Sequence, residues 1–374
     1  MLDNAKNKAC ELIVYPQEEK YINESIRNFQ GCPTIAVTKK GRIFLGWYSG
    51  GRREPHMDNF NLVVYSDDGG KTWTKPVLVI PSSLKNCIQA LDIQMWINPD
   101  GELCIYWVQN NTVPHPGVTE HIEIKNGKPW VTVDGYDFFD FDHAMWKTVC
   151  HNPDADVLEF SKPEYMDKGF LRCKPTVLKD GRQLYFNYDQ NSDRYGYSIS
   201  TDGGKTHKHY YGAKKLLTCF DEGMAYEMLD GRIRMLARTE HGTGYLAESY
   251  SFDGGLTWSD AVLSDIESPN TRFFVARMPS GNILLINNDH RMDRKNMTVY
   301  LSEDDGVTWK YKRLIDDRNN LSYPDVDFFD GKIYLTYDRE RTGAKEILFL
   351  CFTEDDIMND SYVFEPAIVS KPSV

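Results

Sequence analysis

The chain has 374 residues, of which 41% are hydrophobic and 26% charged, as is typical of an ordinary soluble globular protein. Its formal net charge of −12 argues against nucleic acid or an anionic membrane surface as a partner. The eight cysteines form no CxxC pair, the N-terminal residues lack a secretion signal and no apolar run is long enough to span a membrane, so we expect a cytoplasmic protein with free thiols.

Six hairpin signals follow the first strand-like segment, ELIVY at 11–15. Each signal is a polar residue, a glycine, a second polar residue and an apolar one, a pattern typical of a tight turn between two strands. The last four glycines lie 50 residues apart, which indicates a structural repeat. The six glycines are Gly41, Gly101, Gly181, Gly231, Gly281 and Gly331.

A second repeat of eight residues, S-x-D-x-G-x-T-W, follows four of these hairpins. It reads SDDGGKTW at 66–73, STDGGKTH at 200–207, SFDGGLTW at 251–258 and SEDDGVTW at 302–309. Aspartate and glycine favour turns, and a β-like run precedes each copy, so we expect a turn between two strands. We interpret the serine, threonine and tryptophan as packing this turn against its own sheet rather than binding a ligand.

One repeat therefore contains four strands, and a repeat of about 50 residues with four strands predicts a blade of a β-propeller. The six hairpins predict an all-β, six-bladed propeller of four-stranded antiparallel blades, formed as a single domain by residues 1–374. The 80 residues between Gly101 and Gly181 predict insertions around 109–170 that wall one face. The segment 11–15 is expected to supply a strand where the last blade closes the ring.

The same topology predicts where a site would lie. The hairpins and octapeptides share one face of the propeller, so the opposite face carries the starts of the innermost strands and the loops between second and third strands. Charged groups gathered there favour binding of an anion or a polyol. At the strand starts these are Cys32, Asp92, Arg172, Glu222, Arg272 and Ser322 beside Tyr323. In the loops they are Arg52, Arg53, Glu54, Asp58, Asn59, Arg238, Arg291, Arg294, Asp338, Arg339 and Arg341.

The four octapeptides resemble the Asp boxes of the sialidase (neuraminidase) superfamily, and the chain is similar to its bacterial members with such repeats over roughly residues 25–355. The resemblance implies a six-bladed propeller with a tyrosine nucleophile, a glutamate partner, an aspartate that acts as acid and base, and three arginines that hold the substrate's carboxylate. The segments LSYPD, FDEGMAYEMLDG and HMDNFNLVVYSDDG imply these catalytic roles for Tyr323, Glu222 and Asp58, respectively.

The resemblance also implies which arginines bind the substrate. The segment LARTE implies Arg238 as the second arginine, and RKNMTVYLSEDDG implies Arg294 as the third, with Arg291 as its alternative. Three further residues complete the predicted substrate-binding set: Arg272, Arg53 and Asn59.

The first arginine is where the chain departs from the family. The segment NFQGCPTI has Gly31 at that position, and Arg27 lies four residues earlier. A bidentate contact between arginine and carboxylate is strong and specific. Its loss gives the pocket room and removes charge, which puts sialic acid itself in doubt as the substrate.

These residues predict a retaining exo-glycosidase that acts on a non-reducing terminal sugar of small oligosaccharides. A tyrosine with an ordinary pKa near 10 needs a base such as Glu222 to become a nucleophile, and Asp58 would protonate the leaving oxygen. A neutral nucleophile suits an anionic sugar, although an acidic sugar other than sialic acid and a neutral sugar both remain open. No histidine and carboxylate set has metal-ligand spacing, so we expect no catalytic metal and no cofactor.

Two other functions also remain open. In a polysaccharide lyase, Tyr323 would act as base or acid while Arg238 or Arg294 neutralises a uronate carboxylate, and the unsaturated product would absorb in the ultraviolet. In a non-catalytic sugar-binding propeller, the site would bind without turnover. The presence of Tyr323, Glu222 and Asp58 together argues against this last function.

Overall fold

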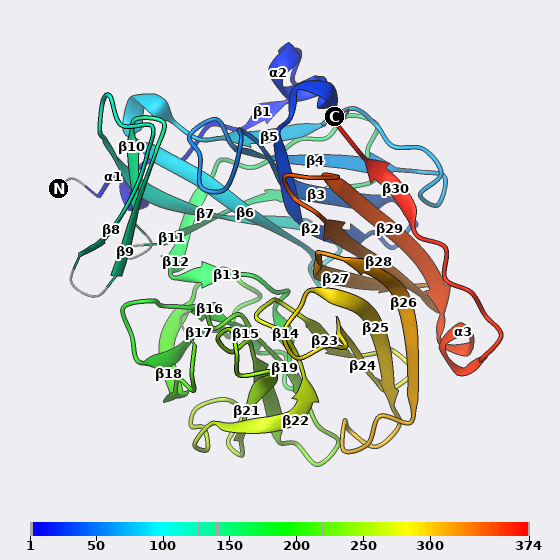
Figure 1. The fold of residues 1–374 in the computed structure, drawn as a ribbon. Coiled ribbons are helices and arrows are strands. Elements are labelled where there is room, and N and C mark those ends of the chain that lie inside the picture. The colour runs from blue at the N-terminus through cyan, green and yellow to red at the C-terminus, as the bar shows by residue number, and fades with distance from the viewer. Residues whose placement is uncertain (1–2, 126–127, 140–142, 219, 373–374) are drawn as a thin grey trace.

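The repeats fold into antiparallel sheets that follow one another around a common centre (Figure 1). The computed structural model describes residues 3–125, 128–139, 143–218 and 220–372. In Figure 1 the chain passes from the blue and cyan sheets through the green and yellow ones to the orange and red sheet, which lies beside the first. The all-β propeller class predicted from the sequence is confirmed.

The first and last sheets meet where the ring closes. Their strand orders are β1-β5-β4-β3-β2 and β27-β28-β29-β30. The strand expected at 11–15 exists as β1, but it pairs with β5 at the edge of the first sheet, because β30 already completes the last one. The expectation that this segment closes the last blade is therefore wrong. The bounds are β1 (Ile13–Val14), β2 (Phe29–Val37), β3 (Ile43–Gly50), β4 (Phe60–Ser66), β5 (Leu78–Pro81), β27 (Leu321–Phe329), β28 (Lys332–Arg339), β29 (Glu346–Thr353) and β30 (Ala367–Ser370).

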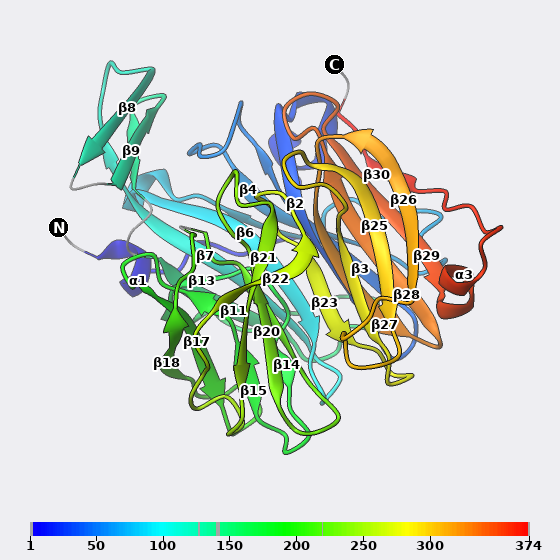
Figure 2. The same cartoon turned by 60° about the horizontal axis from the view of Figure 1, so that its bottom comes forward.

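The second sheet has seven strands because additional strands extend it. Strands β8, β9 and β10 add to the far end of β7, and β8 and β9 project away from the ring (Figures 1 and 2). They fall within the predicted insertion at 109–170, of which residues 126–127 and 140–142 lie outside the described part. The bounds are β6 (Ile88–Ile97), β7 (Leu103–Pro114), β8 (Glu120–Lys125), β9 (Lys128–Val133), β10 (Tyr136–Phe139), β11 (Ala144–Cys150) and β12 (Glu164–Lys168).

The remaining sheets follow the four-stranded pattern with one interruption. Strands β13 and β16 form a separate pair, and the residues between β13 and β14 include Pro175, which cannot donate a backbone hydrogen bond. The prediction of six four-stranded antiparallel blades is not confirmed, because the seven hydrogen-bonded sheets have five, seven, two, four, four, four and four strands. The bounds are β13 (Phe170–Leu171), β14 (Thr176–Val177), β15 (Gln183–Tyr185), β16 (Asn187–Tyr188), β17 (Arg194–Ser200), β18 (Lys208–Lys214), β19 (Gly223–Glu227), β20 (Ile233–Ala237), β21 (Tyr245–Ser251), β22 (Val262–Glu267), β23 (Phe274–Arg277), β24 (Ile283–Asn288), β25 (Lys295–Ser302) and β26 (Tyr311–Asn319).

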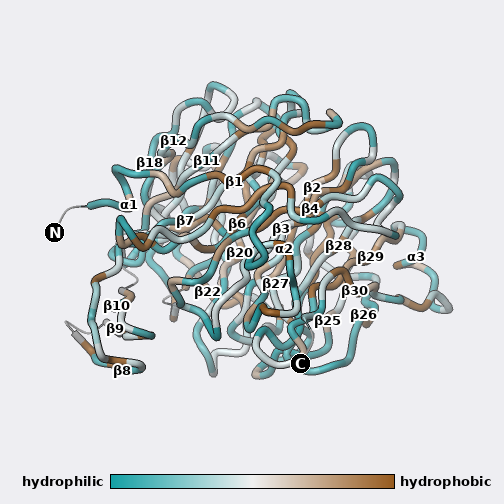
Figure 3. The backbone as a smooth tube through the Cα atoms, turned by 90° about the horizontal axis from the view of Figure 1, so that it is seen from above, coloured by the Kyte–Doolittle hydropathy of each residue, from teal (hydrophilic) through white to brown (hydrophobic). Residues whose placement is uncertain are grey.

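Helical segments are short and lie outside the sheets. They are α1 (Asn4–Asn7), α2 (Glu19–Ile22), η1 (Glu24–Ile26), η2 (Leu84–Asn86) and α3 (Glu354–Met358). Within the described residues, none has the length and apolar character that crossing a membrane requires. Figure 3 shows hydrophobic residues along many of the strands and hydrophilic ones along much of the connecting chain. The seven described cysteines are free, and Cys219 lies outside the described residues.

The octapeptides form turns that their own side chains stabilise. In the copy at 251–258, Asp253 accepts hydrogen bonds from the Thr257 backbone N–H at 2.8 Å and from its hydroxyl at 2.6 Å. Tyr197 of the preceding sheet donates to the Gly255 carbonyl at 2.7 Å. The octapeptide is a structural turn as predicted, but it joins two neighbouring sheets rather than packing only against its own.

Three of the innermost strands contain a residue in the left-handed conformation. Strands β2, β6 and β27 each have a shift of register, and there Cys32, Asp92 and Tyr323 adopt φ angles of 55°, 46° and 55°. Few residues other than glycine adopt this conformation, and such strain is concentrated at functional sites. It occurs here at the end of the ring where Asp92 and Tyr323 line a cavity.

Candidate active site

A cavity of about 260 Å³ lies at the end of the ring opposite the hairpin glycines. Its walls combine converging charged groups with aromatic rings, as is common in sites for small molecules. The lining residues are Glu54, Pro55, Gln89, Leu91, Asp92, Val131, Phe138, Phe170, Tyr188, Gln190, Phe220, Glu222, Arg238, Arg294, Tyr323 and Arg341.

Tyr323 is the centre of a hydrogen-bonded group of three side chains. Its hydroxyl donates to Oε1 of Glu222 at 2.7 Å. Nη1 of Arg238 donates to Oε2 of Glu222 at 2.7 Å and to the Tyr323 oxygen at 3.2 Å. Glu222 directly precedes β19, Arg238 directly follows β20 and Tyr323 lies in β27, so two sheets hold the group. The structure thus brings together the tyrosine and glutamate that the sequence paired.

The surrounding charges keep the Glu222 carboxylate ionised. Burial opposes its ionisation, but the charges of Arg238 and Arg172 outweigh burial, so the pKa of Glu222 lies below its ordinary value. Burial and the neighbouring carboxylate raise the pKa of Tyr323. The resting pair is therefore a neutral phenol that donates its proton toward a carboxylate.

Three arginines give the cavity a cationic wall. The guanidinium of Arg341 lies 4.3 Å from the centre of the Tyr323 ring and that of Arg294 lies 6.0 Å from it. Arg294 donates to the backbone carbonyl of Asn270 at 2.9 Å, and no carboxylate of the described residues forms an ion pair with it. Burial and the charges of Arg341 and Arg238 lower the pKa of Arg294. An anionic group in the cavity would relieve this repulsion.

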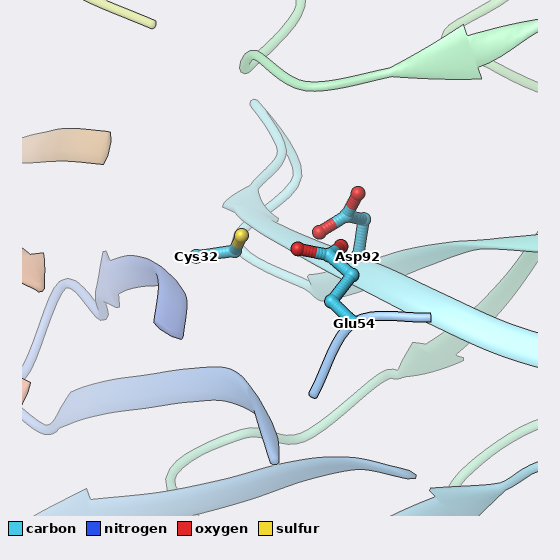
Figure 4. Close-up of side chains that lie close together, drawn as sticks. All are labelled: Cys32, Glu54 and Asp92. Carbon is cyan, nitrogen blue, oxygen red and sulfur yellow. The ribbon is translucent and has the colours of Figure 1, made fainter. Parts of the chain in front are cut away.

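Two carboxylates and a thiol lie close together (Figure 4), and the two carboxylates, of Glu54 and Asp92, line the same cavity. One ligand atom from each of Cys32, Glu54 and Asp92 lies within 4.8 Å of the others, close enough to hold a metal ion. However, Asp92 forms an ion pair of 3.3 Å with Arg172, and Glu54 one of 3.2 Å with Arg341. Burial also raises the pKa of Cys32, which keeps its thiol neutral. These contacts disfavour a cation, so we interpret Glu54 and Asp92 as acids that face the cavity.

Apolar groups line the cavity beside these charges. The rings of Phe170 and Tyr188 stack with centroids 5.1 Å apart. Val131 and Phe138 come from β9 and β10 of the inserted strands, so part of the predicted insertion walls this cavity. The Arg238 guanidinium lies 5.4 Å from the centre of the Phe220 ring. These side chains make one part of the cavity wall apolar.

Two of the predicted site residues line a different cavity of about 380 Å³. The side chain of Asp58 is 75% exposed there and does not line the cavity that holds Tyr323. Asn59 is buried, and its amide donates to the Tyr48 hydroxyl at 3.0 Å and to the Arg53 carbonyl at 2.9 Å. Asn59 therefore holds the loop before β4 in place, and the exposed Asp58 lines a different cavity from the one that holds Tyr323.

Three predicted arginines also lie outside the lining of the Tyr323 cavity. Arg272 is fully buried in an ion pair of 3.0 Å with Asp325. Arg291 lies 4.5 Å over the Tyr245 ring. Arg53 pairs with Glu120 on β8. Of the nine predicted site residues, the cavity contains Tyr323, Glu222, Arg238 and Arg294.

The cavity also contains charged residues to which the sequence assigned no role, namely Glu54, Asp92 and Arg341. All of them belong to the charged positions that the topology placed at this face, so their spacing from the hairpin glycines was the signal that could have selected them. The aromatic wall has no such signal, because its members come from separate strands and loops.

The sequence matches the family model of the BNR repeat-like domain over residues 41–335. The anhydrosialidase of Macrobdella decora is 26% identical over 242 residues, which are 57% of this chain. The matched part spans about 30% of the length of that relative.

Solved structures with the same fold include sialidases and trans-sialidases. The NanB sialidase of Streptococcus pneumoniae has a TM-score of 0.66 at 17% identity, with 93% of this chain and 71% of that chain covered. The intramolecular trans-sialidase of Ruminococcus gnavus also has a TM-score of 0.66 at 15% identity, with 95% and 99% covered. At these identities the likeness shows a common fold.

Proposed function

Because this chain belongs to the family of BNR repeat-like domains, we propose that it is a sialidase-like glycosidase that releases an acidic sugar from the non-reducing end of small oligosaccharides. The observation that carries the proposal is the contact between the Tyr323 hydroxyl and Glu222, at 2.7 Å, in a cavity with three arginines in its wall. A nucleophile, its base and an anion-binding wall therefore face the same space.

The proposed reaction proceeds with retention through two displacements. The Tyr323 oxygen attacks the anomeric carbon, its proton passes to Glu222, and the bond to the leaving oxygen breaks as an acid protonates that oxygen. Water then attacks the anomeric carbon of the glycosyl–tyrosine intermediate and gives a proton to the same acid, while Glu222 returns its proton to Tyr323. Arg238 contacts both the Tyr323 oxygen and Glu222, so its charge stabilises the negative charge that they share.

We propose Glu54 as the acid and base of this reaction. Glu54 lines the cavity, whereas Asp58, to which the sequence assigned the role, lines another one. Glu54 retains 28% side-chain exposure, so it can reach a leaving group that departs toward solvent, while Asp92 is almost fully buried. Glu54→Gln and Asp58→Asn distinguish the two assignments, since the catalytic acid is the one whose loss lowers kcat.

The wall favours an acidic sugar over a neutral one. Arg294 has no carboxylate partner among the described residues, and a bound carboxylate would supply one. A neutral tyrosine nucleophile avoids the repulsion that a carboxylate nucleophile would exert on such a sugar.

Intramolecular transfer is a second candidate outcome of the same chemistry. The apolar wall of Val131, Phe138, Phe170 and Phe220 limits access of water to the intermediate. A hydroxyl of the bound sugar could then attack the anomeric carbon in place of water and give an anhydro sugar. The name of the anhydrosialidase relative describes such a product for that protein.

The test is cleavage of a panel of exo-glycosides, including a sialoside, uronosides and neutral glycosides, by the wild type and by Tyr323→Phe. We expect release of an acidic sugar by the wild type and a loss of kcat of about two to four orders of magnitude in the variant, because the nucleophile is absent. Mass spectrometry of the sugar distinguishes hydrolysis from intramolecular transfer, since an anhydro sugar lacks one water.

The outcomes against the proposal are equally distinct. Cleavage of neutral glycosides alone would overturn the acidic substrate. An unsaturated product that absorbs in the ultraviolet would identify a lyase. Tight binding without turnover in either protein would identify a sugar-binding propeller.

A further inference from the structure

Arg341 occupies the space that a side chain at position 31 would need. Arg341 follows β28, and Gly31 lies in β2, at the other side of the closure between the last and first sheets. A Cβ atom at Gly31 would lie 2.7 Å from Cγ and 2.8 Å from Cδ of Arg341, and 2.8 Å from Oδ2 of Asp338. Real Cβ atoms do not approach other atoms so closely, and Asp338 is fully buried and cannot move aside.

The backbone does not explain the glycine. Gly31 is not among the glycines with positive φ, so its conformation is open to any residue. The glycine is therefore required by what lies over it, which is the aliphatic part of the Arg341 side chain together with the Asp338 carboxylate.

Several contacts hold the Arg341 guanidinium in one place. Nε donates to Asp338 at 3.1 Å and Nη1 donates to Glu54 at 3.2 Å. Asp338 is held in turn by the backbone N–H of Cys32 at 2.7 Å. The Arg341 carbonyl accepts a hydrogen bond from the Gln30 backbone at 3.0 Å. Among the described residues, Nη2 makes only a long contact of 3.5 Å, to Ser322, so this nitrogen is available to a ligand in the cavity.

We infer that Arg341 is the residue that determines specificity for a carboxylate-bearing sugar, and that Gly31 serves to keep its path into the cavity open. The inference rests on the proposed function, which it deepens. Arg341 joins Arg238 and Arg294 in the cavity wall, so the carboxylate is bound by three arginines although position 31 has none. The absence of an arginine at position 31 does not remove a charge from the site, because Arg341 enters the cavity from the end of β28 instead.

The contact with Glu54 gives Arg341 a second effect. The ion pair of 3.2 Å places Glu54, the proposed acid, beside Arg341, which would bind the sugar's carboxylate. Removal of Arg341 therefore changes the charge next to Glu54, and the pH profile of kcat should shift as well as KM. Replacing a residue that only supported the fold would shift neither the pH profile of kcat nor KM.

The experiment compares Arg341→Ala with Arg291→Ala, in which an arginine outside the cavity is removed. Binding of an acidic sugar and of its uncharged carboxamide is measured by calorimetry for both variants and the wild type. We expect the preference for the acid to fall by about ten- to a hundredfold in Arg341→Ala, the value of a hydrogen bond to a charged group. Arg291→Ala should retain the wild-type preference for the acid over the carboxamide.

A second comparison tests the role of Gly31. Gly31→Ala should weaken acid binding in the wild-type background, because the new methyl group displaces Arg341. In the Arg341→Ala background Cγ and Cδ of Arg341 are gone and only the Asp338 oxygen still crowds the new methyl group, so the same change should have a smaller further effect on acid binding. Equal losses of acid binding in both backgrounds would show that Gly31 supports the fold, and would overturn the proposed pairing of Gly31 with Arg341.

The outcomes also separate this inference from the proposed function. If the wild type cleaves acidic glycosides and Arg341→Ala keeps its preference for the acid, the inference is wrong and the glycosidase stands. If no glycoside is cleaved but acid binding depends on Arg341, the glycosidase is wrong and the carboxylate site stands. Thermal unfolding of each variant shows whether a loss reflects the site or the fold.

Discussion

At the scale of single residues, the site depends on a tyrosine that a strained backbone presents to a carboxylate. Tyr323 has a φ of 55° and donates to Glu222 at 2.7 Å. The strain is maintained because β27 is bonded on both sides of the shift in its register. Arg238 and Arg172 lower the pKa of Glu222 despite its burial, so the base is ready at neutral pH.

Replacing this base should disable the nucleophile without removing it. We expect Glu222→Gln to lower kcat by about two to four orders of magnitude, because no group remains to accept the Tyr323 proton. The pKa of Glu222 is lowered, so wild-type activity should fall on the acid side only at pH values below the ordinary glutamate range near 4.3. The variant should lack this acidic limb in a pH profile of kcat/KM.

Glu248→Gln is the matched control. Glu248 is bonded to Arg234 at 2.6 Å and lies outside the cavity lining. Equal losses of activity in the two variants would mean that Glu222 acts through the fold rather than on the reaction.

At the scale of elements, the octapeptide turns connect each sheet to its neighbour. In the copy at 66–73, Trp73 packs against Phe349 of the last sheet with ring centroids 5.5 Å apart. A Cβ at Gly70 would lie 2.3 Å from the Phe349 ring, whereas one at Gly69 would meet nothing within 4 Å. Both glycines have positive φ, of 88° and 77°. The two positions therefore differ mainly in their contact with the neighbouring sheet.

This pair separates backbone strain from contact between sheets. Gly69→Ala should destabilise the protein by about 1 kcal/mol, the cost of a left-handed alanine. Gly70→Ala should add about 1–3 kcal/mol, because the ring of Phe349 has to move. Denaturant unfolding measures both differences. Similar losses in the free energy of unfolding for Gly69→Ala and Gly70→Ala would show that contact between the turn and Phe349 does not stabilise the closure of the ring.

At the scale of the whole molecule, one buried carboxylate joins several sheets. Asp325 in β27 accepts hydrogen bonds from Thr34 at 2.8 Å and Lys174 at 2.7 Å. It also accepts from Gln94 at 3.3 Å and Arg272 at 3.0 Å. These donors come from β2, from β6 and from the segments that precede β14 and β23. Arg272, predicted to bind substrate, instead stabilises the centre of the ring.

The pH dependence of stability should report on this centre. Burial opposes the ionisation of Asp325, but Lys174 and Arg272 lower its pKa to about 2. Because this pKa is below the unfolded value near 3.9, the carboxylate stabilises the fold above that pH, by about 2 kcal/mol, and the contribution is lost as pH falls toward 2. Asp325→Asn should cost about 3–5 kcal/mol at neutral pH, since it leaves buried cations unpaired.

Urea unfolding at several pH values checks this prediction. The difference in the free energy of unfolding between wild type and Asp325→Asn should narrow between about pH 4 and pH 2, within which Asp325 gains its proton. Asp265→Asn, at an exposed position on β22, is the control. A difference that stays constant across this range would mean that Asp325 acts through packing rather than charge.

Features that depend on neighbours along the chain could be predicted from the amino-acid sequence alone. The glycine hairpins, the octapeptide turns and the propeller class follow from repeated local conformational preferences, and the spacing from the hairpins placed Tyr323, Glu222, Arg238 and Arg294 at one end of the ring. The strand at 11–15 was predicted for the same reason, although its partner was not.

Which side chains share a cavity or an ion pair depends on how distant segments pack, and this is visible only in the folded molecule. Gly31 and Arg341 are adjacent because the first and last sheets close the ring, and no local pattern encodes how closely the Arg341 side chain passes over Gly31. Asp58 lines a different cavity from Tyr323 although its segment matches the expected motif, and Arg272 pairs with Asp325 although it occupies an equivalent strand start. Such choices are made by packing and charge balance between segments far apart in sequence, which the periodicity of a repeat does not contain.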